Sequence, residues 1–345
     1  MDIQNHFYGH AAVLAAYAGK RRPRHVAGLI QHGWTTSSPL AVQFGDFPTV
    51  ERSGRRRLLV WSHRSRSWSP SDTDRPTVAI GAPFAYLAQA ERVRVPEAAD
   101  RSLIMPLHGT RVMEVLGDQD ALATYYRDTE GPSTVCLHAD DVARPEIVSA
   151  WQRAGHRIVM AGQRHDPEFL GRILRLVASH RRTVSNRLMT SIMYAASLGR
   201  EVAVHGDPLS LGGGDNVALD WIERTWPELH GERLDGAAAT AVARAEIGWD
   251  SVLPPTELIQ VLGWGRPHAG PALDYWMAAP LQKARNVLGL GERAEGSTEE
   301  AQGLSPLHFL RHPMSHLPKP LPRRVPSLDP LPEPFAVPDL GVVRR

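Results

Sequence analysis

Between residues 133 and 208, short apolar segments alternate with longer segments of helical character, and this pattern constrains the fold more than any other feature. The apolar segments are residues 133–141, 156–162, 182–186 and 201–208. The segments between them are residues 143–155, 166–180 and 188–199. Strands that alternate with helices of this length are typical of right-handed βαβ units, so the sequence predicts a parallel sheet.

Residues 1–130 repeat the pattern less regularly. Apolar runs that end in turns carrying His or Gly span residues 25–34, 56–65, 76–84 and 102–110. Helical segments are expected at 11–17, 84–89 and 112–127, and residues 129–132 (Thr-Glu-Gly-Pro) then break the chain. We therefore expect an α/β fold with two Rossmann-like parallel-sheet domains, residues 1–130 and 131–290.

The last part of the chain has a different composition. From residue 291 onward it is rich in Pro, Ser and Glu, and the run PLPRRVPSLDPLPEPFAVP covers residues 320–338. So many prolines cannot sustain a helix or a central strand, because each removes a backbone donor. Residues 291–345 are expected to form a flexible, extended Pro-rich tail.

Composition excludes several classes of protein. The net charge of +2 gives no bulk-charge argument for nucleic-acid binding. One cysteine, Cys136, cannot form an internal disulfide and lies in an apolar run, where it is expected to be buried. No apolar run is long enough to span a bilayer and no signal peptide is evident, so a cytoplasmic protein is expected, with peripheral membrane contact left open. No Cys/His or acidic spacing is typical of a metal site.

Polar residues follow the predicted strands of the second half. In open parallel sheets, ligands bind beyond the carboxyl ends of the strands, where the strand order reverses. This rule selects the residues that directly follow each strand as candidates for ligand binding. They are His138, Gly162, Arg164, His165, Ser185, Asn186 and Arg187.

Segment 185–199 (SNRLMTSIMYAASLG) is the most informative of these turns. Ser185 and Asn186 leave a strand, and Thr190 and Ser191 stand in the first turn of the next helix. A helix amino terminus offers unpaired N–H groups and a partial positive charge, which suits a phosphate. The sequence has neither a Walker A motif nor GxGxxG, so the phosphate would not be held as in P-loop or dinucleotide-binding folds.

Residues 155–204 resemble the donor-binding domain of bacterial GT-B glycosyltransferases, above all the capsule-type sialyl-, Kdo- and glycerophosphate-transferring enzymes. The hydroxyl-rich turn matches at Ser185, Asn186, Thr190 and Ser191. The helix-to-strand passage "YA..LG..V" matches at Tyr194, Ala195, Leu198, Gly199 and Val202. The His-Pro motif of several such enzymes is absent from the expected strand end, and the glycine-rich loop of their first domain is also absent.

The resemblance implies two domains facing a cleft and metal-independent transfer of a sugar, with an ulosonic acid among the candidates. The donor would be a nucleotide-sugar, the acceptor a polysaccharide or glycoconjugate glycan, and no cofactor would be needed. A base must take the proton of the acceptor hydroxyl. His32 is the first candidate for this base, His108 the second and His10 the third, while Arg164 and Arg187 would contact phosphate or carboxylate.

Other functions remain open at this point. Polysaccharide pyruvyl transferases share the fold and carry a pattern "S.RLH", which Ser185, Arg187 and Leu188 match but in which Met189 replaces the His. A sugar-nucleotide epimerase on the same fold is another alternative. A third is a non-catalytic GT-B-like scaffold that binds partners through the Pro-rich tail.

Overall fold

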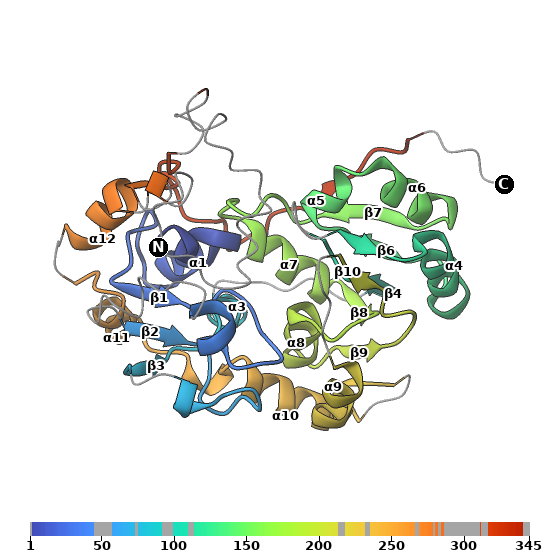
Figure 1. Cartoon of the computed structure of the whole chain (residues 1–345), viewed down its shortest axis with the longest axis horizontal. Helices are drawn as coiled ribbons and strands as arrows, with labels where there is room; N and C mark the ends of the chain where they lie inside the picture. The colour runs from blue at the N-terminus through green and yellow to red at the C-terminus, as the bar shows by residue number, and fades with distance from the viewer. Residues whose placement is uncertain are drawn as a thin grey trace.

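The computed structural model describes residues 2–44, 57–72, 75–91, 99–109, 114–212, 218–231, 235–265, 269–278, 280–281, 284–285, 311 and 317–340. Within these residues the chain is an α/β protein with a six-stranded, a three-stranded and a two-stranded sheet. Figure 1 shows the three-stranded sheet beside the larger one, with helices packed on both.

The six-stranded sheet contains the strands predicted for residues 133–208. Its order is β11 (Phe335–Ala336), β7 (Arg157–Met160), β6 (Thr134–Cys136), β4 (Ala99–Ile104), β8 (His180–Ser185) and β9 (Glu201–Val204). All neighbouring strands are parallel except β11, which pairs antiparallel with β7 at the edge. From β4 onward, the parallel strands follow the order of the first five strands of a Rossmann fold, which has its switch point between the first and fourth strands.

The central strand of this sheet comes from the part of the chain assigned by sequence to the first domain. β4 pairs with β6 on one side and with β8 on the other. Residues 99–104 therefore belong to the larger sheet, which extends across the boundary expected near residues 128–132. The pairing was not visible in the sequence because β4 and β8 are about 80 residues apart along the chain.

Helices cover both faces of the larger sheet. α4 (Gln119–Glu130) and α6 (Pro145–Arg153) pack on the face that receives Ile104. α7 (Phe169–Ala178) and α8 (Thr190–Ser197) pack on the opposite face, which receives Leu103. Adjacent β4 residues thus enter two different cores, and both are fully buried. Burial on both faces explains why the parallel strands are continuously apolar.

The helix expected over residues 112–127 was placed too early. The structure has a short strand β5 (Val115–Leu116), which pairs with β10 (Ser210–Leu211), and α4 starts only at Gln119. The Asp118 side chain accepts a hydrogen bond of 2.9 Å from the backbone N–H of Ala121 and thereby caps the helix. The residues from 110 to 113 lie outside the described part of the chain.

The smaller parallel sheet consists of β1 (Gly28–Ile30), β2 (Arg57–Val60) and β3 (Thr77–Ala79), in that order. Around it lie η1 (Asp2–Gly9), α1 (His10–Tyr17) and α3 (Pro83–Ala88). The remaining elements are η2 (Leu40–Phe44), η3 (Pro70–Asp72), α5 (Ala139–Val142), α9 (Leu219–Thr225), η4 (Pro227–Leu229), α10 (Gly236–Glu246), η5 (Trp249–Ser251), α11 (Pro255–Val261), α12 (Gly270–Leu273) and η6 (Asp274–Ala278).

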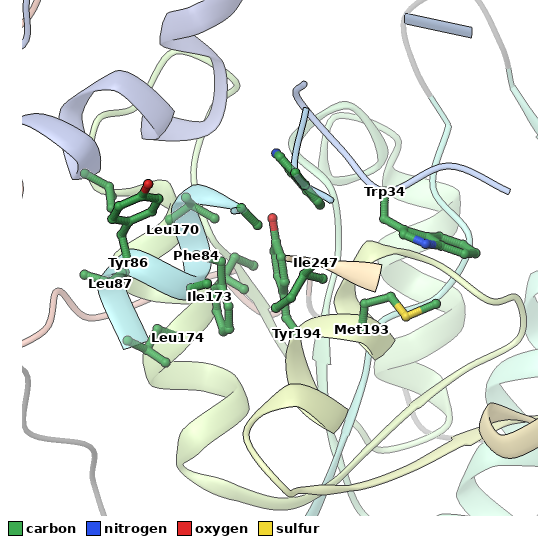
Figure 2. Packing of buried hydrophobic residues seen from close by; sticks show 14 of the residues in the cluster. Trp34, Phe84, Tyr86, Leu87, Leu170, Ile173, Leu174, Met193, Tyr194 and Ile247 are labelled. Carbon is green, nitrogen blue, oxygen red and sulfur yellow. The ribbon is translucent and has the colours of Figure 1, made fainter. Parts of the chain in front are cut away.

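One continuous hydrophobic core joins the two parallel sheets. Phe84 of α3 stacks on Tyr194 of α8, with ring centroids 4.0 Å apart and planes 7° from parallel. Trp61, which follows β2, is fully buried and lies 6.1 Å from the same tyrosine ring. Figure 2 shows Phe84 and Tyr194 between α3, α7 and α8. Apolar side chains therefore fill the space between the two parallel sheets where α3 meets α8.

Two expectations from composition concern burial and membranes. Cys136 is buried on β6, and burial raises the pKa of its thiol to about 12, so it stays a neutral packing residue. Among the helices that the structure describes, none is long and apolar enough to cross a membrane.

The Pro-rich segment is extended, as expected, but residues 317–340 are packed against the protein and the expectation of a flexible tail is wrong for them. Leu331 is buried, and β11 adds to the edge of the sheet next to β7. The Arg172 guanidinium lies 4.2 Å from the ring centroid of Phe335 and donates to the carbonyl of Glu333. An edge strand tolerates prolines because one side of it needs no backbone donors. In Figure 1 this segment crosses the molecule to the larger sheet.

The replacement Leu331→Ala tests this packing. Removing a buried leucine side chain costs about 2–5 kcal/mol, so the free energy of unfolding should fall by an amount in that range. Leu340→Ala removes the same atoms from a side chain that is 49% exposed and should change stability by less than about 0.5 kcal/mol. Urea unfolding of both variants measures the difference. Equal stabilities would show that the segment does not pack in solution.

Candidate functional site

The topology points to the crevice at the carboxyl ends of β4 and β8. The chain first adds β6 and β7 on one side of β4, then crosses over to add β8 and β9 on the other. The connections that leave β4 and β8 therefore run to opposite faces of the sheet, and a crevice forms between their ends. The residues that follow these strands, and those that follow β6 and β7, are the candidates for ligand contact.

In the turn after β8, the side chains of Asn186 and Arg187 form hydrogen bonds with the backbone of neighbouring loops. The Asn186 side chain accepts a hydrogen bond of 2.7 Å from the Leu107 N–H and donates one of 2.8 Å to the Asp207 carbonyl. The Arg187 guanidinium donates to the carbonyls of Pro208 and Leu209. Asn186 thus ties the loop after β4 to the loop after β9. Ser185, fully buried, accepts a hydrogen bond of 3.3 Å from the Arg187 N–H.

The loop after β7 docks onto the amino-terminal segment. The Tyr8 N–H donates to the Arg164 carbonyl at 2.6 Å. Gly9 has φ of 76°, and a Cβ there would lie 2.5 Å from the Pro167 carbonyl oxygen, so only glycine fits. Gly162 has φ of 116°, and its Cβ would lie 2.7 Å from an Asp166 carboxylate oxygen. These contacts bring Arg164 from the larger sheet against η1.

A row of ionisable side chains, the histidine cluster, runs across this junction. Its members are His10, His32, His108, His138 and Arg164. The rings of His108 and His138 stack with centroids 4.5 Å apart. Arg164 interacts electrostatically with both His138 and His32, and His32 does so with His10. His108 is exposed at one end of the row, and His10, only 1% exposed, is buried at the other.

Several polar atoms of this region are buried without a hydrogen-bond partner among the described residues. They are Nδ1 of His10, Nδ1 of His32, Nε2 of His138 and Oγ of Ser191. Buried polar atoms are nearly always bonded, because leaving one unpaired costs about 1–3 kcal/mol. Three such ring nitrogens in one cluster therefore indicate a place where a polar ligand completes the hydrogen bonding.

Burial keeps the rings of His10, His32 and His138 neutral. It lowers the pKa of His10 to about 3, and the neighbouring His32 adds to the effect. Burial lowers the pKa of His32 to about 4, with a further contribution from the Arg164 charge. The pKa of His138 also falls to about 4, mainly through burial and then through His108. At neutral pH each of these three rings therefore has one nitrogen that can accept a proton.

Three other ionisable groups adjoin the cluster. Tyr8 has φ of 54°, uncommon for a residue with a side chain, and burial raises the pKa of its hydroxyl. Asp141 is buried and accepts from the Gly109 N–H at 3.3 Å; burial raises the pKa of this carboxyl. The Asp140 carboxylate lies 3.6 Å from Nδ1 of His138 and opposes the lowering of its pKa.

The loop that carries His32 is fixed against the start of α8. The His32 N–H donates to Gln43 Oε1 at 2.9 Å, and the Trp34 N–H donates to Thr190 Oγ1 at 3.1 Å. The Trp34 ring donates to Glu246, a carboxylate that is 1% exposed and also accepts from the Trp226 ring. Trp34 thus serves packing and hydrogen bonding. These contacts hold His32 near the amino terminus of α8.

The structure brings together part of the set predicted from sequence. His32, His108, His138 and Arg164 meet at the junction, with Thr190 and Ser191 at the helix start beside it. His165 lies outside this group: it is exposed, and its ring lies 5.1 Å from the ring of Phe7. Gly162 allows the close turn after β7, and Asn186 and Arg187 hold neighbouring loops by hydrogen bonds. Sequence reasoning missed Tyr8 and Asp141. The FYGH run at residues 7–10 was the available signal for Tyr8, and the Asp pair after β6 was the signal for Asp141.

The chain was compared with known proteins. A scan against protein-family models finds no match, and a search of the curated proteins finds none either. Within the described residues, no group of three or more His, Cys, Asp or Glu side chains is placed to hold a metal ion. The chemistry of the site has to be inferred from its own residues.

The lowered pKa of His32 predicts a pH dependence of stability. The unfolded side chain titrates near pH 6.5, and the folded one near pH 4. Between these values the folded state binds fewer protons, so its stability is full above pH 6.5 and falls as the pH drops toward 4. His32→Gln should reduce the slope of unfolding free energy against pH by about 1.4 kcal/mol per unit. Urea titrations from pH 4.5 to 7.5 measure this, and parallel curves for the two proteins would refute it.

Proposed function

We propose that this protein is a glycosyltransferase that moves a sugar from a nucleotide-activated donor to a glycan acceptor without a metal ion. The observation that carries the proposal is the histidine cluster, with its unpaired buried ring nitrogens beside Arg164 at the carboxyl edge of a Rossmann-like sheet. This is the place where open α/β sheets bind nucleotides and related ligands.

The two sides of the site come from different sheets. His108, His138 and Arg164 follow β4, β6 and β7 of the larger sheet. His10 and His32 come from the segments that surround the smaller sheet. A donor held by the first group would face an acceptor held by the second, which is the division of labour in a GT-B enzyme. In this proposal the donor-binding unit begins at β4, so the domain boundary lies before residue 99.

The leaving group in such a transfer is a nucleotide phosphate, which gains negative charge as the bond to the sugar breaks. The Arg164 guanidinium suits this charge, since it is always protonated and offers several donors. The first turn of α8 adds backbone N–H groups and a partial positive charge, with the Ser191 hydroxyl unpaired beside it. Met189, the residue that precedes this helix, provides no side-chain cap that would compete with a ligand.

His32 suits the role of the base. Its ring is neutral at physiological pH and can take the proton of the acceptor hydroxyl. As the proton moves to His32, the acceptor oxygen bonds to the anomeric carbon. The bond from this carbon to the phosphate oxygen breaks, and the nucleotide leaves with the electron pair. A phosphate bound next to the ring would raise the pKa of His32 toward neutrality and make it a stronger base.

Nucleotide binding is the first consequence to measure. Added at 100 times its Kd, the correct nucleotide should stabilise the protein by about 2.7 kcal/mol, which a thermal shift detects. CMP, CDP, UDP and GDP are the compounds to compare, and CMP would favour an ulosonic acid donor. Arg164→Met should weaken binding roughly 10- to 100-fold, since a charge-assisted hydrogen bond is lost. Arg157→Met, on an exposed residue of β7, is the matched control. A chain that no nucleotide stabilises would sink the proposal.

The role of His32 needs a separate test. His32→Gln preserves the size and polarity of the side chain but cannot accept a proton at neutral pH. Transfer to acceptor should fall by at least about 100-fold, the usual contribution of a general base, whereas nucleotide affinity should fall by no more than about 10-fold, the loss of one hydrogen bond. His165→Gln, on an exposed ring outside the cluster, should retain full activity. Unchanged turnover of His32→Gln would remove this residue from catalysis.

A further inference from the structure

A strongly basic hollow lies on the surface away from the histidine cluster. It has a volume of about 470 Å³ and is lined by Gly19, Lys20, Arg21, Arg22, Arg24 and Arg323. None of these lining residues is acidic, although the whole chain has a net charge of only +2. Positive charge is thus concentrated where the loop after α1 meets the carboxyl-terminal segment.

Large apolar side chains are exposed beside this hollow. Residues 270–281 expose Leu273, Trp276, Met277 and Leu281, and the nearby Leu317 is also exposed. The exposed fractions of Met277 and Leu281 are 66% and 65%, whereas the exposed fraction of the neighbouring Tyr275 is 3%. Single exposed apolar residues are ordinary, but several gathered together usually mark an interaction surface.

Tyr275 connects the basic and the apolar parts. Its ring lies 5.0 Å from that of His25 and 5.2 Å from that of Trp276, and its hydroxyl donates to the Lys319 carbonyl at 2.5 Å. Arg24, at the hollow, also donates to the carbonyl of Trp264. Residues 19–25, 270–278, 280–281 and 317–324 therefore form one contiguous region, the basic-apolar surface. Figure 1 shows α12, in orange, on the side of the smaller sheet.

We propose that the basic-apolar surface binds the face of an anionic lipid bilayer. Arginine and lysine side chains in the loop and in residues 319–324 would meet lipid phosphates, and each basic residue near such a surface adds favourable energy. Trp276 would lie at the interface, and Met277 and Leu281 would enter the acyl region. A nucleic acid would satisfy the charges equally well but would leave these aliphatic side chains in water. The combination of charge and exposed aliphatic side chains favours the bilayer.

Vesicle sedimentation with the full chain tests the proposal. The protein should bind vesicles that contain 30% phosphatidylglycerol and should not bind pure phosphatidylcholine. The double change Arg21→Gln and Arg22→Gln should weaken binding roughly 30-fold, from the usual contribution of two basic residues. Arg64→Gln with Arg153→Gln removes the same charge from exposed ion pairs elsewhere and should leave binding unchanged.

A second variant separates lipid from other polyanions. Met277→Glu keeps the basic hollow intact but places a charge where the acyl region is expected, so binding to anionic vesicles should fall at least tenfold. If this variant binds vesicles as the parent does, or if single-stranded DNA competes with vesicles while Met277→Glu has no effect, the surface is a general polyanion site and the proposal is overturned. Equal binding to phosphatidylcholine vesicles would also overturn it. None of these readouts depends on the transferase activity proposed above.

Discussion

The insertion of β4 between β6 and β8 is the contact on which the rest of the structure depends. It joins a strand from residues 99–104 to strands that follow 30 and 80 residues later, and it places Leu103 and Ile104 in the cores of both faces. Without it, β6–β7 and β8–β9 would be two separate pairs with no crevice between them. The switch point, the bracing role of Asn186 and the position of His108 all follow from that strand.

A second level of organisation joins the smaller sheet to this framework. The Phe84–Tyr194 stack and the contact between Gly9 and Pro167 hold η1 and α3 against α7 and α8. The same junction gathers histidines from both parts of the chain, and it buries the rings of His10, His32 and His138 and keeps them neutral. Unpaired polar atoms are costly, and the proposed ligand would supply the hydrogen bonds that the fold leaves unmade at three of these ring nitrogens.

Much of the fold was accessible from sequence, because local patterns determine local elements. Most strands and helices of residues 133–208 were predicted within a few residues, since apolar runs and helix-start signals such as Pro145 are encoded nearby. The strand expected over residues 133–141 was too long, because β6 ends at Cys136 and the short helix α5 follows at Ala139–Val142. The partner of β4 and the docking of the Pro-rich segment were not predictable in this way, because pairing at long range leaves no local signal. The same distinction applies to the site. Their position at strand ends identified His32, His138 and Arg164. The role of Asn186 was missed, because its amide is occupied by backbone groups of Leu107 and Asp207, which lie in loops far apart along the sequence.

Imidazole nitrogen spectra of the protein titrated with nucleotide show directly whether the histidine cluster binds the ligand. If it does, the ring resonances of His32 and His138 should move together and saturate at one nucleotide concentration, because both rings interact with Arg164 and keep an unpaired nitrogen. Both ring nitrogens of His156 are already bonded, one accepting from the Ser133 N–H and the other donating to the Ala123 carbonyl, so its resonances should not respond. If the resonances of the cluster stay fixed while the nucleotide binds, or if His156 alone moves, the nucleotide binds elsewhere and the histidine cluster is not its site.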